Sequence, residues 1–91
     1  MDRETLEGRI QLELAQLQAR FPQVSACRST LDEWQEDGNS RYALRLDIRW
    51  PQHQTLVSGD AKDNPLGALR AALEAAERQL QQEPGVKRGK P

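Results

Sequence analysis

Regularly spaced arginines are the residues of this sequence best suited to binding chemistry. Arg41, Arg45 and Arg49 recur at every fourth position in the segment RYALRLDIRW, residues 41–50, with Asp47 among them. The guanidinium group is planar and always charged, which suits bidentate contacts to phosphate. Two interpretations are open. The arginines form a solvated face on which they pair with neighbouring carboxylates, or they form a surface that contacts anions.

The other chemically versatile residues form no pattern typical of a catalytic or metal site. His53 is the only histidine, and no carboxylate or cysteine stands at ligand spacing from it. Cys27, the only cysteine, excludes an internal disulfide and is expected to pack as a small apolar residue. The acidic pairs at 32–33 and 36–37 flank a polar turn, whereas acid–base catalysis needs an enclosed environment. We therefore expect no enzyme, cofactor or metal.

Charge is distributed unevenly along the chain. The 91 residues carry a net charge of −1, which does not favour nucleic-acid binding by overall attraction. Lys87, Arg88 and Lys90 lie near the end, so residues 1–86 hold ten basic and fourteen acidic side chains. We expect one domain over residues 1–83 and a mobile basic tail over residues 84–91.

Nothing in the sequence predicts a membrane protein. No apolar run approaches the roughly 18–20 residues of a membrane span. The start MDRETLEGR is too charged for a signal peptide. A single cysteine is compatible with a reducing compartment, so we expect a cytoplasmic protein.

Helices are predicted near both ends of the chain. Apolar residues spaced 4-4-3-4 from Leu6 to Phe21 predict a helix over about 3–21, with Asp2 as N-cap. Phe21-Pro22 ends it, because a residue before proline is disfavoured in the α region. A second helix over about 65–82 begins with Pro65, after Asp63 or Asn64 as cap.

Between the helices, alternation predicts an antiparallel sheet. Extended segments are expected over about 24–34, 41–50 and 54–59, with Asp-Gly in the turn at 36–40 favouring a hairpin. The predicted fold is α+β, α-β-β-β-α, with a three-stranded antiparallel sheet covered on one face by two helices. Double-stranded-RNA-binding domains share this order. The predicted core consists of Leu6, Ile10, Leu14, Leu17, Phe21, Tyr42, Leu44, Leu46, Ile48, Trp50, Leu66, Leu69, Leu73, Ala76 and Leu80.

Three segments resemble a known family over roughly residues 5–80. They are ACR (26–28), RYALRLDIRWP (41–51) and TLVSGDAKDNPLGALRAALEAAERQL (55–80). They are similar to the ribosome hibernation promoting factors, also called ribosome-associated translation inhibitors. That family has a strand ending in a hydrophobic pair and a small residue, a loop Asp, and a helix of the type A-x-R-x-A-x-x-x-A-x-x-Q-L. Here Leu56-Val57-Ser58, Asp63 and residues 68–80 fill those places.

The resemblance implies a β-α-β-β-β-α protein that sits on the small ribosomal subunit and blocks mRNA and tRNA positions in stationary phase. Arg28, Arg70 and Arg78 occupy places where family members often hold basic residues. The chain departs from the family in three respects. Only Met1-Asp2 precedes the first helix where a strand is expected, that helix carries glutamates where lysines are usual, and Asn64-Pro65-Leu66 replaces an aromatic residue after the loop Asp.

We therefore predict a ribosome-associated protein that modulates translation or ribosome hibernation under stress by occupancy. Its expected partners are the small ribosomal subunit and ribosomal RNA, not DNA or a membrane. The alternative is a protein-interaction module that kept the fold and lost RNA binding. Without the family's first strand, one sheet edge stays unpaired, and we expect it to form a homodimer or to be shielded by N-terminal residues. The predicted RNA-binding residues are Arg28, Arg41, Arg45, Arg49, Arg70, Arg78, Lys87 and Arg88.

Overall fold

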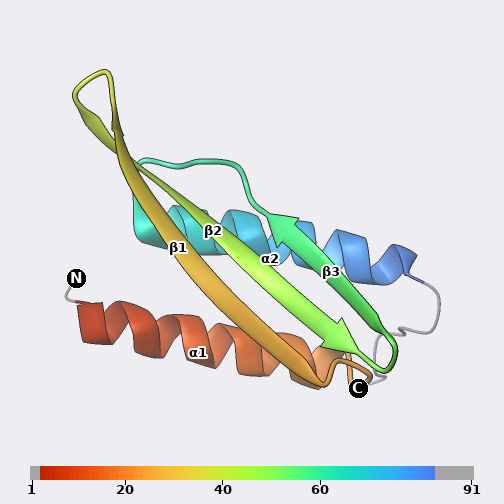
Figure 1. Ribbon diagram of the computed structural model, residues 1–91. Coiled ribbons are helices and arrows are strands. Elements are labelled where there is room, and N and C mark those ends of the chain that lie inside the picture. Colours follow the sequence, from red (N-terminus) through yellow and green to blue (C-terminus); the bar gives the residue numbers. More distant parts are fainter. Residues whose placement is uncertain (1–2, 84–91) are drawn as a thin grey trace.

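The computed structural model describes residues 3–83 and has the predicted order of elements (Figure 1). The strands form one antiparallel sheet in the order β1-β2-β3, and both helices lie on the same face of it. The predicted α+β fold is therefore confirmed. The predicted cap Asp2 and the predicted tail, with Lys87 and Arg88, lie outside the described residues. The elements are α1 (Arg3–Arg20), β1 (Ala26–Glu36), β2 (Asn39–Trp50), β3 (His53–Ser58) and α2 (Pro65–Gln82).

Two tight turns set the register of the sheet. Asp37 and Gly38, with φ of 53° and 80°, join β1 to β2 in the left-handed conformation that Asp-Gly favours in hairpins. Pro51 and Gln52 join β2 to β3, and Gln52 has a φ of 65°. Both turns hold two residues between paired positions, so the alternation of β2 continues in register across the sheet.

The strand bounds differ from the prediction by one or two residues. Val24 precedes β1 because its N–H donates to Phe21 O in the preceding turn, at 3.0 Å.

The core lies between the sheet and the helices. The predicted core residues of β2 from Leu44 to Trp50 are buried, and so are those of α1 from Ile10 to Leu17 and Phe21 just after α1. The predicted burial of Leu6, Tyr42 and Leu73 is only partial, and Leu66 is wrong as a core residue because it is 40% exposed. Compared with the prediction, the buried stripe of α2 is rotated toward Ala68 and Ala72, so Leu66 and Leu73 lie at its border. The buried residues that the prediction left out are Val24, Val57, Ala68 and Ala72.

Specific contacts place α2 against the rest of the fold. Asn64 caps the helix, since its Oδ1 accepts a hydrogen bond from Gly67 N–H at 2.7 Å, and Pro65 follows it. Arg20 Nε lies 2.8 Å from Glu77 Oε1 and links the end of α1 to α2. No helix within residues 3–83 is long and apolar enough to cross a membrane.

The end of β3 approaches the backbone of α2 very closely at Gly59. A Cβ atom on Gly59 would stand 2.5 Å from Ala72 N and 2.7 Å from Ala71 C. Only glycine allows this separation, because real Cβ atoms essentially never come within 3.0 Å of another atom. This contact places Ser58 and Asp60 beside the face of α2 that carries Arg70 and Arg78.

Candidate functional site

The predicted arginines of β2 each contact a carboxylate on the open face. Arg45 donates from Nε to Asp32 Oδ2 at 2.8 Å and from Nη2 to Asp32 Oδ1 at 3.3 Å. Arg49 donates from Nη2 to Asp47 Oδ2 at 3.1 Å. Arg41 Nε lies 3.5 Å from a Glu36 carboxylate oxygen. Of the two interpretations of these arginines, pairing with neighbouring carboxylates is the arrangement that the structure shows.

Asp47 is held in its charged form by its neighbours. Its carboxylate accepts hydrogen bonds from Gln54 Nε2 at 2.8 Å and from Arg49, and these bonds lower the pKa of Asp47 below its ordinary value of 3.8. Arg28 stands opposite Asp47 in the β1–β2 register and adds attraction. The Arg28 side chain makes no hydrogen bond or ion pair with the described part of the chain.

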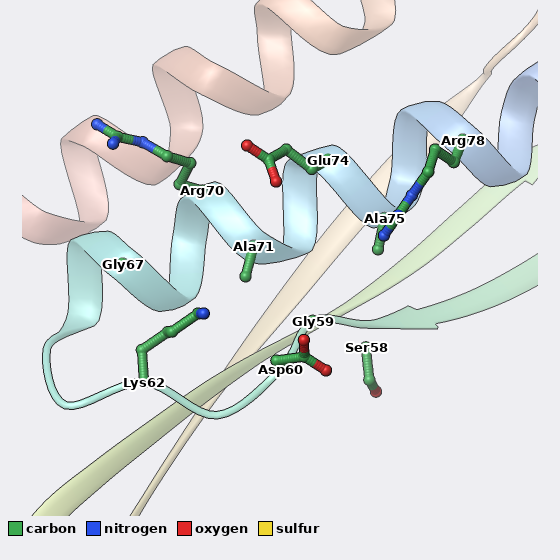
Figure 2. A pocket seen from close by; sticks show the side chains of 10 residues that line it. All are labelled: Ser58, Gly59, Asp60, Lys62, Gly67, Arg70, Ala71, Glu74, Ala75 and Arg78. Carbon is green, nitrogen blue, oxygen red and sulfur yellow. The ribbon is translucent and has the colours of Figure 1, made fainter.

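A groove of about 340 Å³ separates α2 from the segment that follows β3 (Figure 2). Small residues of α2 form part of its lining, because Gly67, Ala71 and Ala75 follow one another at every fourth position. The cations at the groove are Lys62, Arg70 and Arg78, and the anions are Asp60 and Glu74. The lining is completed by Ser58 and Gly59.

The groove continues along α2 toward its C-terminal end. A second hollow of about 380 Å³ shares Ser58, Ala75 and Arg78 with the first and extends it past Leu56 to Gln79 and Gln82. Figure 2 shows Lys62 reaching from its loop toward α2, while Arg70 points away from Asp60. The surface is therefore a mixed-charge groove with cations along its rim.

The three groove cations differ from the arginines of β2 in one respect. The side chains of Lys62, Arg70 and Arg78 make no ion pair or hydrogen bond with residues 3–83. Lys62 is positioned through its backbone, which exchanges two hydrogen bonds of 2.8 Å with Tyr42. These three cations are therefore free to bind an external anion without losing an internal partner.

Lys62 was absent from the predicted site. A signal for it existed in the sequence, since Lys62 is the only lysine of residues 1–86 and precedes a predicted helix. Arg70 and Arg78 were predicted and lie together on this surface, whereas Arg41, Arg45 and Arg49 lie on the opposite face of the sheet. Lys87 and Arg88 lie outside the described residues.

The two remaining chemical candidates lie away from this groove. His53 stacks on Trp50 with ring centroids 5.5 Å apart. Burial, and secondarily the charge of Asp47, raises the pKa of the Cys27 thiol from 9.0 to about 11, which makes it a poor nucleophile at neutral pH. The described part of the chain contains no group of three or more side chains arranged to hold a metal ion.

Comparisons with protein-family models, curated proteins and solved structures find no match to this chain. The similarity to hibernation promoting factors therefore rests on the quoted segments of the sequence. It stays a prediction.

Proposed function

We propose that this protein associates with the small ribosomal subunit, contacts ribosomal RNA through the cations of the α2 groove, and modulates translation or ribosome hibernation by occupancy. The observation that carries the proposal is the freedom of Lys62, Arg70 and Arg78, whose side chains have no partner within residues 3–83. Cations of this kind are the usual ligands of nucleic-acid phosphates.

The pairing of the sheet arginines favours the α2 side over the open sheet face. A phosphate that approached Arg45 or Arg49 would compete with Asp32 or Asp47 for the same guanidinium groups. Releasing an exposed ion pair removes a favourable contact, and the freed carboxylate would then repel the phosphate. Arg70 and Arg78 require no such exchange.

The two anions of the groove limit the attraction. Asp60 and Glu74 stand among the three cations, so the net charge of these five side chains is only +1. We therefore expect RNA binding of modest affinity that weakens as salt is raised, with a slope set by the few phosphate contacts.

The experiment is co-sedimentation of the tagged protein with small ribosomal subunits from stationary-phase cells over a series of salt concentrations. The test variant is Arg70→Glu with Arg78→Glu, and the matched control is Arg45→Glu with Arg49→Glu. Each phosphate contact that is lost lowers the slope of log affinity against log salt by roughly one unit. We expect the magnitude of this slope to fall by about two units in the test variant and by less in the control variant.

Three further measurements complete this design. Lys62→Ala should weaken association because it removes a free cation at the groove. Deletion of residues 85–91 should weaken it modestly. Circular dichroism of each variant checks that the fold is retained. Association that is unchanged in all the variants would contradict the electrostatic proposal.

A protein-interaction module is the second candidate function. The observation that favours it is the ion pairing of Arg41, Arg45 and Arg49, which neutralises the open sheet face in a body with more acidic than basic residues. Association with ribosomal subunits that resists high salt and tolerates Arg70→Glu with Arg78→Glu would support this candidate.

A further inference from the structure

The outer edge of the sheet at β1 is a long strand with an open side. β1 holds 11 residues, pairs with β2 along one side, and has no strand of residues 3–83 on the other. Its first half, from Ala26 to Leu31, contains no proline or lysine, and Arg28 is its only charged residue. Proline, lysine and other charged residues are the usual means of blocking a strand edge. This part of the edge is therefore competent to pair.

The backbone groups that face outward from β1 follow from the hydrogen bonds at the other side of β2. Tyr42 exchanges two backbone hydrogen bonds with Lys62, so it directs its N–H and C=O away from β1. Directions alternate along a strand, so the odd-numbered residues of β2 bond to β1, where their partners are even-numbered. The residues of β1 that direct N–H and C=O outward are therefore Cys27, Ser29, Leu31 and Glu33.

The hydrophobic core is incompletely covered on the same side. Leu6 of α1, and Cys27 and Leu31 of β1, pack against the core yet remain partly exposed. Figure 1 shows the N-terminal half of α1 on the outer side of β1. A strand added at this edge would have α1 beneath its inner face, and its inward side chains would cover these apolar residues.

We propose that the β1 edge binds an extended segment of another polypeptide, which adds a fourth strand to the sheet. The outward N–H and C=O groups supply main-chain hydrogen bonds, and the partly exposed Leu6, Cys27 and Leu31 select apolar side chains at alternate positions. On the open face Arg28 is attracted to Asp47 of β2 but donates no hydrogen bond to it, so its guanidinium donors can bind an acidic residue of the incoming segment. This site lies at the opposite edge of the sheet from the α2 groove and does not depend on RNA binding.

Another polypeptide suits this edge better than a second copy of the chain. Antiparallel pairing of two β1 strands about a two-fold axis would place both α1 helices beneath the joined strands. Since α1 already extends beyond its own β1 (Figure 1), the two helices would compete for the same space. A single strand without a helix on that face meets no such obstacle.

The probe is a fluorescein-labelled synthetic peptide that alternates valine and threonine and carries one glutamate in a threonine position. Fluorescence anisotropy with the full chain should show saturable binding between micromolar and millimolar concentrations. Arg28→Glu should weaken binding of this peptide about tenfold, because an attraction becomes a repulsion. A peptide with lysine in place of glutamate should bind the Arg28→Glu variant more tightly than the glutamate peptide does. Arg70→Glu is the control, with an equal charge change far from β1, and should leave both affinities unchanged.

Amide hydrogen exchange measured by NMR tests the geometry of the site. The peptide should slow exchange at Cys27, Ser29 and Leu31 and leave Arg28 and Thr30 unchanged, because the latter amides already bond to β2. Absence of binding, or slowing without this alternation, would overturn the proposal. Slowing of the same amides by raised protein concentration alone would assign the edge to a second copy and equally overturn it.

Discussion

Replacement of Gly59 by alanine tests whether the contact between β3 and α2 holds the fold together. Gly59 lies just after β3, and its N–H donates to Leu44 O at 3.3 Å. Its φ is outside the left-handed region, so alanine is conformationally acceptable there and the expected effect is steric. The substitution therefore isolates the cost of separating the strand from the helix.

The magnitude follows from the atoms that an added Cβ would meet. They are Ala72 N at 2.5 Å, Ala71 C at 2.7 Å and Ala72 Cα at 2.8 Å, and these distances fall short of ordinary contact at 3.4 Å by about 0.6–0.9 Å. All three atoms are backbone, so no side-chain rotation relieves the overlap. Overpacking of this kind costs about 1–3 kcal/mol. We expect a value in the upper half of this range, because Ala72 is buried beneath the sheet.

The assay is urea unfolding followed by far-ultraviolet circular dichroism, with Gly8→Ala as the matched control. A Cβ on Gly8 would meet nothing within 4 Å, and Gly8 lies inside α1. The control should therefore raise the free energy of unfolding by about 0.5–1 kcal/mol through helix propensity. Gly59→Ala should lower it by about 2–3 kcal/mol. A loss below about 0.5 kcal/mol would refute the reasoning, since it would show that β3 moves away from α2 at little cost.

Three other substitutions or reactions test separate parts of the structure. Leu46→Ala should lower the free energy of unfolding by about 2–5 kcal/mol, because Leu46 is fully buried in the central strand; a urea titration that gave less than about 1 kcal/mol would contradict this placement. Gln52→Gly should raise it by about 0.5–1 kcal/mol, because Gln52 has a φ of 65° that glycine adopts without strain; thermal unfolding should show a higher midpoint. Cys27 should react with iodoacetamide about 100-fold more slowly in the folded protein than after unfolding in urea at the same pH, since its pKa is raised from 9.0 to about 11 and the thiolate is correspondingly scarce. Equal rates of reaction with iodoacetamide in the folded and unfolded protein would contradict the burial of Cys27. The same pKa shift affects stability: because the folded pKa lies above the unfolded value, the thiol stabilises the fold fully below about pH 9, and this contribution is lost as the pH rises through about 11.

Local chemistry in the sequence determined the elements and their order. The apolar spacing from Leu6 to Phe21 and the Asn64-Pro65 start predicted both helices to within one residue. The alternation over 41–50 and the Asp37-Gly38 turn predicted the central strand and its hairpin. Each of these signals lies within a few residues of the structure that it specifies, because helix periodicity, capping and turn conformation are local properties. Because the predicted strands are joined by short connections, they were expected to run antiparallel.

Tertiary structure alone decided which cations are free. Arg45 binds Asp32, thirteen residues earlier, because the β1–β2 register places these side chains on neighbouring strands of the same face. Lys62 joins Arg70 and Arg78 at one groove because Gly59 lies against α2 and Lys62 bonds to Tyr42. The rotation that buries Ala68 and Ala72 instead of Leu66 likewise depends on how closely α2 packs on the sheet. Register between strands and rotation of a helix are set by contacts between distant segments, so the spacing of residues within one segment does not determine them.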